Sequence, residues 1–539
     1  MTERTMRRLA LDITELKRIL DHARSRPIQQ TEYDQLEAVL STLARLSQEL
    51  ENKRTSITRL RHLLFGPSSE KTAQVLKPKT GSSLAGKGRK KKRKGHGRNG
   101  ADAYQGGKRV EVAHESLRCG EPCPQTDCTG KVYTLSEPGV IVRIQGMPPL
   151  PATVYALEKL RCNLCGTVFT AKAPAGIGET KYDERAVGMI ACLKYGAGFP
   201  FHRLEKLEAS LGIPLPAATQ WDLVHGAYRQ LEPLFDALVD EAAQGEVLHN
   251  DDTPMKILQL MAENQTSEHA EKAPKRTGLF TSGIISKCGG QLIALFFTGR
   301  RHAGENLKSV LENRSKQLAA PIQMCDALSR NLPEELKTIL AHCLSHGRRR
   351  FVEVVENFPE EVRYVLDSLA KVYKNDATAR NENLSLQERL SFHQQHSKPV
   401  MQALHDWLER QFAQKLVEPN SSLGEAISYM LKHWQELTLF LRKAGAPLDN
   451  NICERALKKA ILHRKNALFY KTRNGARVGD LFMSLIHTAE LAQVNAFDYL
   501  CELQRHAEHV RDDPAAWMPW NYRETLQQFA RDPPRPALQ

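Results

Sequence analysis

The stretch HNDDTPMKIL at residues 249–258 places two aspartates, Asp251 and Asp252, directly after the apolar residues Val247 and Leu248. A short apolar run followed by polar residues is typical of a buried strand that ends at a loop. Successive side chains of a strand point to opposite faces of the sheet, so only one of these aspartates can enter any given site. Strand alternation does not decide which aspartate that is.

Working outward from this stretch, three more apolar runs follow. They are GLFTSGIIS at 278–286, QLIALFFTG at 291–299 and APIQMCDAL at 320–328, so that with EVLHNDD at 246–252 we expect four strands. The segment at 338–358 then leads from a strand or apolar entry into a helix, and residues 355–445 have a helical pattern. Strands followed by helices indicate a mixed α/β class.

The length and composition of the chain favour a large intracellular protein with a polyanionic partner. Its 539 residues are enough for about three or four domains. The longest purely apolar run, LIALFF at 292–297, is too short to span a membrane, and the charged N-terminus lacks the apolar core of a signal peptide. The net charge of +14 predicts nucleic acid as partner, with an acidic membrane surface as the weaker alternative.

The N-terminal part of the chain contains two segments of different composition. Residues 1–70 are helical in pattern, with apolar positions at 36–64 that step alternately by three and four. This spacing predicts a coiled coil that dimerises, or else a helical hairpin within one chain. Residues 71–110 form a basic linker rich in glycine and serine, which we interpret as an arm that contacts DNA phosphates or as a solvated linker. The candidate contacts are Lys90, Lys91, Lys92, Arg93 and Lys94.

Residues 111–175 hold five of the eleven cysteines, which favours a metal site over disulfides in a reducing compartment. The knuckle LRCNLCG at 160–166 directs two thiolates at one ion, and CPQTDC at 123–128 can supply the other two. The predicted zinc ligands are Cys123, Cys128, Cys162 and Cys165. Cys119 competes with Cys128, and scattered buried cysteines are the alternative interpretation. We expect ribbon strands over 140–146 and 152–162.

Residues 176–240 contain two helical runs around Gly212, in HRLEKLEASLGIPLPAATQWDLV at 202–224. This arrangement is typical of a helix-turn-helix that enters a DNA groove, and equally of helices that serve only as scaffold. At the other end of the chain, residues 496–539 form a C-terminal tail. It is rich in proline from 512 onward, and we expect it to be an irregular arm.

Three acidic side chains, two after predicted strands and one on a predicted helix, could converge on one site. Asp251 or Asp252 and then Asp326 come after strand-like runs, whereas Glu454 shares a helical face with Leu457 and Ile461. Three such carboxylates can hold two Mg²⁺ ions for phosphoryl transfer, because Mg²⁺ prefers hard oxygen ligands. Among 62 acidic residues, however, most are surface groups or helix caps, and that alternative stays open.

Several separated blocks give the chain a family resemblance. LLFGPSSEK, LEKLRCNLCGTVFTA, HNDDTP, QMCDALSRNLP, CLSHGRRRF, DNNICERALKKAILHRKNALFY and WMPWNY occur in this order, and the chain thereby resembles transposases of the insertion sequence 66 family. The resemblance implies a multidomain α+β protein with an N-terminal coiled coil, a small zinc-ribbon-like segment and a helical DNA-binding segment. An α/β ribonuclease H-like core of the retroviral-integrase type follows at 241–495, with a helical insertion at about 355–445.

The resemblance also implies roles for individual residues. Asp251, Asp326 and Glu454 match the family's catalytic triad, which binds two Mg²⁺ ions, or Mn²⁺, while Asp252 stands where a glutamate is usual. Cys343 and His346 match a Cys and His block, and we prefer a satisfied core pair to a metal site there. On the same helix as Glu454, about three turns further on, Arg464 and Lys465 contact DNA phosphates or stand at the surface. The family's C-P-x-x-C pair reads CPQTDC here.

The implied function is that of a DNA transposase. It binds the terminal inverted repeats of its element, cuts DNA with the help of metal ions and transfers the strand to target DNA. Its expected partners are DNA, one or more further copies of itself, and small accessory proteins encoded by the same element, without any membrane. The expected location is the bacterial cytoplasm, in association with the nucleoid. Two alternatives are a non-catalytic DNA-binding regulator and a stand-alone metal-dependent nuclease.

Overall fold

The computed structural model describes most of the chain from residue 110 onward. Described are residues 110–125, 128–135, 147–161, 167–176, 180–267, 277–333 and 336–531, with the shorter pieces 18–19, 21, 23, 26–30, 32–34, 36, 75, 141–142, 144, 163, 165 and 178. The predicted coiled coil beyond Leu36, the basic cluster at 90–94 and Cys162 lie outside the described residues. Residues 78–151 form one compact unit, and residues 1–77 with 152–539 form the other.

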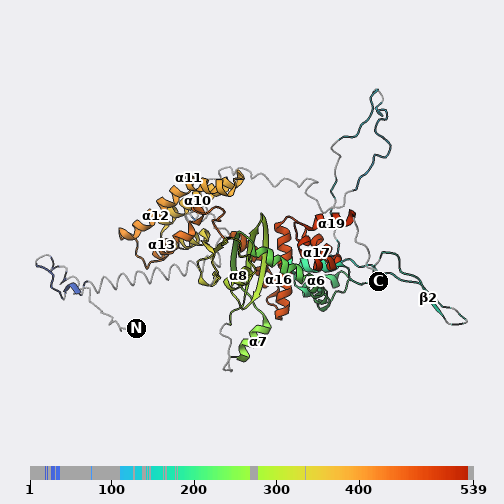
Figure 1. Cartoon of the computed structure of the whole chain (residues 1–539), viewed down its shortest axis with the longest axis horizontal. Coiled ribbons are helices and arrows are strands. Elements are labelled where there is room, and N and C mark those ends of the chain that lie inside the picture. Colours follow the sequence, from blue (N-terminus) through green and yellow to red (C-terminus); the bar gives the residue numbers. More distant parts are fainter. Residues whose placement is uncertain are drawn as a thin grey trace, which may run out of the picture. The chain divides into compact units, whose positions relative to one another are not determined.

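A five-stranded sheet in the order β5-β4-β3-β6-β7 is at the centre of the larger unit (Figure 1). β3 (Val247–Pro254), β4 (Phe280–Cys288) and β5 (Gln291–Gly299) are antiparallel, whereas β6 (Ile322–Cys325) and β7 (Ile339–His342) continue from β3 in parallel. All four predicted strands are confirmed, and β7 is the apolar entry before the helix. This mixed α/β arrangement is consistent with a ribonuclease H-like core.

The β5 edge of the sheet is covered by α16 (Arg473–Leu491). Three polar side chains of α16, one helical turn apart, accept hydrogen bonds from alternate backbone N–H groups of β5. Thr488 bonds Ala294 at 3.1 Å, Ser484 bonds Phe296 at 3.0 Å and Asp480 bonds Thr298 at 2.7 Å. One turn of helix advances nearly as far as two strand residues, so the two ladders match. The edge strand is thereby closed to further pairing.

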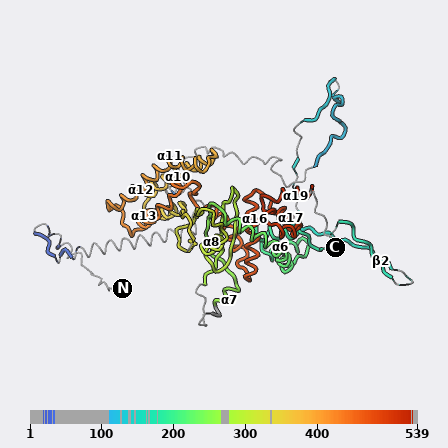
Figure 2. Tube along the Cα trace, viewed as in Figure 1, coloured from blue at the N-terminus to red at the C-terminus, as the bar shows by residue number. Residues whose placement is uncertain are grey.

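The opposite edge of the sheet, β7, leads into the helical insertion. The insertion is yellow to orange in Figure 2. The chain continues as α9 (Leu344–Glu353), α10 (Pro359–Asn381), α11 (Leu386–His396), α12 (Lys398–Ala413), α13 (Ser422–Lys432) and α14 (Trp434–Leu437). The apolar faces of these helices share one buried core with the sheet, in which Met324 and Ala341 pack with Phe351, Leu404 and Ile427. The structure therefore has helices where the pattern at 355–445 predicts them, and they pack in one core with the sheet.

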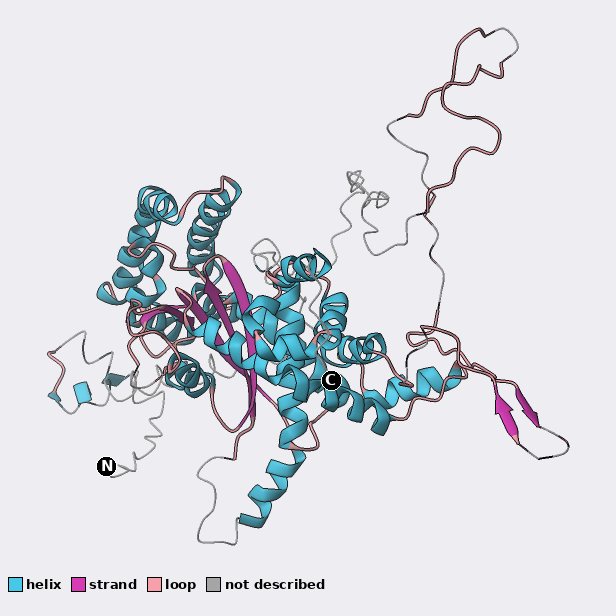
Figure 3. Ribbon diagram, turned by 45° about the vertical axis from the view of Figure 1, so that its right-hand side comes forward, coloured by secondary structure: helices cyan, strands magenta, loops and turns pink. Residues whose placement is uncertain are grey.

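Helices before, between and after the strands complete the larger unit, and Figure 3 shows helices in cyan around the magenta strands. They include α4 (Glu184–Ala191), α5 (Phe201–Ser210), α6 (Ala217–Ala243), α7 (Leu258–Ser267), α8 (Ala303–Leu311) and α15 (Asn451–Ala467). The two helices of the predicted helix-turn-helix are present as α5 and α6, and Gly212 between them has a φ of +78°. Among the described residues, no helix is long and apolar enough to cross a membrane.

The expectation of an irregular arm from residue 512 is wrong. After α17 (Ala496–Arg505) and α18 (Ala507–Asp512), the chain forms a 3₁₀ turn, η5 (Pro514–Trp517), and then α19 (Tyr522–Arg531). Trp517 is 1% exposed and its carbonyl accepts a hydrogen bond from Tyr499 Oη at 2.8 Å. The prolines start and end short elements here, and the aromatic side chains anchor them against α6.

The small ribbon also differs from the prediction. β1 (Lys159–Arg161) pairs with β2 (Val168–Thr170), so the hairpin brackets the LRCNLCG turn. The described residues of 140–146, which are 141, 142 and 144, are not in a strand, and neither are residues 152–158. Both ribbon strands are exposed along their whole length, so no apolar alternation marks their limits in the sequence.

Candidate active site

Strand β3 presents two different faces. On the face toward α15, His249 Nδ1 lies 3.1 Å from Asn450 Oδ1, and Thr253 Oγ1 accepts a hydrogen bond of 3.2 Å from Arg464. Asp251 lies between these two residues along the strand and shares their face. On the other face, Asn250 Nδ2 donates to the Asn331 carbonyl at 2.8 Å. The two aspartates therefore point to opposite sides of the sheet.

Asp252 is held in a buried ionic network. Its side chain is 1% exposed, and its oxygens lie 2.8 Å from His302 Nδ1 and 3.4 Å from an Arg330 nitrogen. His302 stands at the start of α8, so the network ties this face of β3 to that helix. Both carboxylate oxygens are engaged, which leaves Asp252 without a role on the opposite face.

Asp251 on β3 and Asp326 directly after β6 lie at the same level of two neighbouring strands. The parallel register pairs His249 with Met324, and both aspartates follow two residues later. Burial and the negative charge of Asp326 raise the pKa of Asp251 from 3.8 to about 7. Two carboxylates this close without a cation repel each other, so one of them retains a proton near neutrality.

Glu454 lies in the first turn of α15. The start of this helix is fixed by Asn450, whose backbone N–H donates to Cys343 Sγ at 3.2 Å and whose side chain donates to the Asn250 carbonyl at 3.1 Å. Cys453 is fully buried and its thiol contacts the Gly283 carbonyl at 3.3 Å. These contacts seat the helix on β3 and β4. Burial and the charges of Asp251, Asp326 and Glu454 all raise the pKa of the Cys453 thiol, so the three acids surround the same point.

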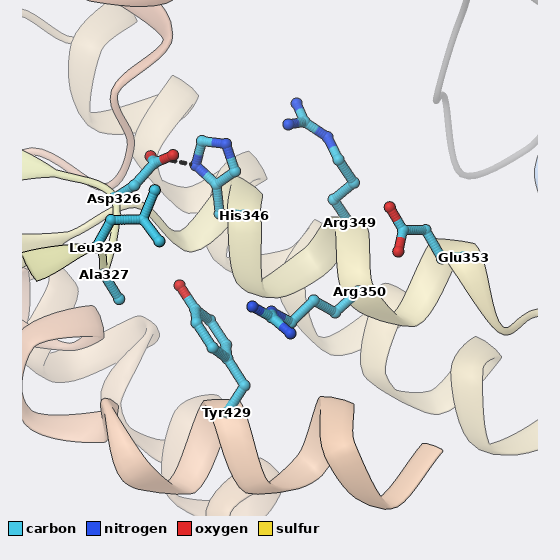
Figure 4. A pocket seen from close by; sticks show the side chains of 8 residues that line it. All are labelled: Asp326, Ala327, Leu328, His346, Arg349, Arg350, Glu353 and Tyr429. Atoms are coloured by element: carbon cyan, nitrogen blue, oxygen red, sulfur yellow. Dashed lines mark ion pairs between the residues drawn. The ribbon is translucent and has the colours of Figure 1, made fainter. Parts of the chain in front are cut away.

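His346 lies between two of the acids. Its Nδ1 is 2.6 Å from Asp326 Oδ1, an ion pair that Figure 4 marks with a dashed line. Its Nε2 is 3.7 Å from Glu454 Oε1. Burial opposes a charge on the ring, but the Asp326 carboxylate and Cys343 outweigh it and raise the pKa of His346 to about 10. The preferred interpretation of Cys343 and His346 as a satisfied core pair fits Cys343, which is buried and accepts from Asn450, and is wrong for His346.

Three polar atoms at this point lack a hydrogen-bond partner among the described residues. They are Asp326 Oδ1, His346 Nδ1 and Glu454 Oε1, and all three are buried. The close approach of the first two therefore lacks the alignment of a hydrogen bond, although their charges attract. Buried polar atoms are nearly always paired in native proteins. The converging carboxylate oxygens are hard donors that suit Mg²⁺ or Mn²⁺, so the residues fit a divalent cation site.

A cavity of about 340 Å³ opens beside the acids. Figure 4 shows that Arg349, Arg350 and Glu353 extend from the same helix as His346, while Tyr429 approaches from α13. The Arg350 guanidinium lies 4.1 Å from the centre of the Tyr429 ring. Arg349 lies 3.9 Å from Glu454. Guanidinium groups beside a carboxylate cluster are suited to hold a phosphate group next to bound cations.

The remaining predicted site residues are not gathered here. Arg464 donates to Thr253 and to the Pro254 carbonyl, so its guanidinium braces the end of β3, whereas Lys465 is exposed. Among the predicted zinc ligands, Cys123 and Cys128 belong to the unit formed by residues 78–151 and Cys165 belongs to the other unit. Cys119, Cys128 and Cys165 are exposed. The four-thiolate site stays a prediction.

Sequence reasoning missed the basic wall of the cavity and the position of His346. A signal was present, because His346, Arg349, Arg350 and Glu353 are spaced by three, one and three residues, which places them on one helical face. CLSHGRRRF therefore presents a histidine and two arginines to one side. The pattern shows that they share a face, but not that this face meets Asp326.

Comparison with known proteins supports the resemblance. The model of the family described as Transposase IS66 family matches residues 179–478, which is more than half of the chain. The uncharacterized protein y4hP of Sinorhizobium fredii is 25% identical over 440 residues, covering 77% of this chain and 76% of the relative. The uncharacterized protein y4jD of the same organism is 25% identical over 420 residues, covering 74% and 77%. The matched region contains the sheet, the insertion and all three acids, and the chain belongs to the IS66 family of transposases.

Proposed function

We propose that the protein is an active transposase that cuts and joins DNA at a divalent cation site formed by Asp251, Asp326 and Glu454. The observation that carries this proposal is a group of buried atoms of Asp326, His346 and Glu454, from a loop and two helices. The three side chains lie within 2.6 and 3.7 Å of one another without aligned hydrogen bonds, and the charge of Asp326 also acts on the buried Asp251. A site that serves only for stability would pair these atoms with each other or with neighbouring backbone groups.

When bound, a pair of Mg²⁺ ions, or Mn²⁺, would activate the attacking oxygen and stabilise the leaving oxygen in phosphoryl transfer. The protein's own residues prepare the site for this chemistry. Asp251 gives up its proton, and His346 gives up its contact with Asp326. Arg349 and Arg350 hold the DNA backbone along the cavity wall, where their fixed charges compensate phosphate without a change of protonation.

The surrounding segments complete the proposed activity. We assign recognition of the element's inverted repeats to the helices within 176–240 and to Lys90, Lys91, Lys92, Arg93 and Lys94, with Lys465 as a further phosphate contact. Zinc held by Cys123, Cys128, Cys162 and Cys165 would fold the small ribbon, and Cys119 is the alternative to Cys128. Self-association through residues 36–64 would bring two DNA ends together, with accessory proteins of the element as further partners.

The experiment is a cleavage assay with DNA that carries an end of the element. Wild type is compared with Asp251→Asn, Asp326→Asn and Glu454→Gln in Mg²⁺, and strand transfer is followed on the same gels. Because each acid supplies several kcal/mol of cation and transition-state stabilisation, each variant is expected to lose about 10³-fold in cleavage rate. Glu353→Gln is the matched control, since Glu353 lines the cavity but lies outside the acid cluster.

The outcomes separate the proposal from its two rivals. Cleavage that survives Asp251→Asn would overturn the site assignment. Cleavage by wild type without joining would instead indicate a stand-alone nuclease. DNA binding without any cleavage, even with the accessory proteins added, would indicate a regulator.

A further inference from the structure

A second group of metal-binding side chains lies where the helical insertion meets the sheet. His342, His433 and Glu436 each offer a ligand atom, and the three atoms lie within 4.8 Å of one another. Two imidazoles and a carboxylate are the donor set that zinc and related transition metals bind with an open fourth position. The group contains none of the residues assigned to the catalytic cations.

The backbone fixes all three residues at a junction. His342 is the last residue of the edge strand β7. His433 stands between α13 and α14, outside helical geometry, and its carbonyl accepts a hydrogen bond of 2.9 Å from the Leu437 N–H. Glu436 lies within α14, which packs on β7. An ion here would join the insertion to the sheet.

His342 provides the independent observation that points to a ligand. Its side chain belongs to a residue that is 5% exposed, and its Nδ1 is buried without a hydrogen-bond partner among the described residues. The ring stands edge-on to the His433 ring, with centroids 5.1 Å apart. A buried imidazole nitrogen without a partner is costly, and bonding to an ion removes this cost.

The charges around His342, His433 and Glu436 are compatible with a bound cation. Burial and the neighbouring His433 lower the pKa of His342. Burial and Lys432 likewise lower the pKa of His433. Lys432 and Arg350 oppose a cation at this place, whereas Glu436 supplies the compensating negative charge.

We propose that His342, His433 and Glu436 form a binding site for a divalent transition metal ion of the zinc class, which clamps the helical insertion to the edge of the catalytic sheet. The clamp adjoins both the cavity and the start of α15. Tyr429, one helical turn before His433, lines the cavity, and its ring centroid is 5.0 Å from that of His433. His342 directly precedes Cys343, which holds the start of α15.

The test measures zinc bound per chain by elemental analysis of the full-length protein after incubation with Zn²⁺ and gel filtration. His433→Ala and Glu436→Gln are each expected to bind one zinc ion fewer than wild type. Any zinc on the cysteines contributes equally to all samples and cancels in this difference. Both residues are half-buried, and circular dichroism of the zinc-free variants verifies that they fold.

A matched control comes from the same insertion. His405, Asp406 and Glu409 form another His and acid group on α12, with both acids exposed, and His405→Ala is expected to leave the zinc content unchanged. Zn²⁺ is expected to raise the melting temperature of wild type and of His405→Ala more than that of His433→Ala. Equal zinc content in all four proteins would overturn the site. The readout uses no DNA, so it is independent of the proposed nuclease activity.

Discussion

The adjacent aspartates on the two faces of β3 have opposite electrostatic surroundings. Asp252 is buried with both oxygens ion-paired to His302 and Arg330. Asp251 faces Asp326, and burial together with the charge of Asp326 raises its pKa. One face is therefore electrostatically complete, and the other is incomplete until a cation arrives.

The partners of a buried carboxylate therefore indicate whether it stabilises the fold or serves a functional site. A carboxylate with partners at both oxygens stabilises the fold and gains nothing from an added ion. A group of carboxylates with unpartnered buried oxygens loses stability in the absence of an ion, and such strain is typical of sites selected for binding. Burial alone does not distinguish the two, because both aspartates of β3 are largely buried.

The largest change in the free energy of unfolding is expected from a substitution of Asp252, on the face of β3 where both carboxylate oxygens are paired. Asp252→Asn leaves Arg330 without its counter-charge and weakens the contact with His302, and we expect it to lower the free energy of unfolding by about 2 kcal/mol, roughly a thirtyfold change in the folding equilibrium. The value is below that of a fully buried pair because Arg330 is 44% exposed. Denaturant titration of the metal-free protein measures it.

Asp251→Asn is the paired variant for this measurement. It removes a charge that Asp326 repels, so the metal-free protein is expected to be at least as stable as wild type, although its cleavage activity is lost. If Asp251→Asn proved the more destabilising of the two, the assignment of a structural and a functional face would be reversed.

The sequence alone predicted much of this arrangement and left out its decisive contacts. The four strands and the helical insertion were predictable because buried apolar runs and helical periodicity are local signals. Strand alternation predicted that Asp251 and Asp252 diverge, but the choice between them came from the family resemblance. Their partners, His302 and Arg330, lie 50 and 78 positions beyond Asp252 and carry no local signal.

His346 and the C-terminal helices show why the remainder was missed. His346 has the spacing of a helical face, yet only the tertiary structure places that face against Asp326 and Glu454. The segment after 512 has the proline content of an irregular arm. It folds because Trp517 is buried, and that burial depends on helices formed hundreds of residues earlier.

The incomplete face is expected to make Mg²⁺ binding dependent on pH. Burial and Asp326 hold the pKa of Asp251 at about 7, and the cation binds only the ionised carboxylate. Below pH 7 protons compete, so the apparent Mg²⁺ affinity is expected to fall by up to about tenfold for each pH unit and to level off above pH 7. The Mg²⁺ concentration that gives half of the maximal thermal stabilisation measures this affinity.

The raised pKa of Asp251 also predicts how the stability of the metal-free protein changes with pH. The folded protein holds the Asp251 proton more tightly than the unfolded chain, whose ordinary value is 3.8. Stability therefore falls as pH rises from about 4 to about 7, because the folded state binds more protons in that window. Asp251→Asn is expected to flatten this part of the profile, and an unchanged profile would contradict the assigned pKa.

The smallest effect is expected from a substitution that changes how closely α15 packs against the Asp251 side of the sheet. Gly283 pairs with Asp251 in the register of β3 and β4, and a Cβ there would lie 3.0 Å from Leu457 and 3.6 Å from Cys453 Sγ. Gly283→Ala should therefore push the helix that carries Glu454 outward. We expect a loss of about 1 kcal/mol in stability and about a fivefold loss in cleavage rate, because overpacking shifts a catalytic group slightly. Gly299→Ala, with no heavy atom within 4 Å of the added carbon, is the matched control. If both variants cleave alike, the seat of α15 on β4 does not set the position of Glu454.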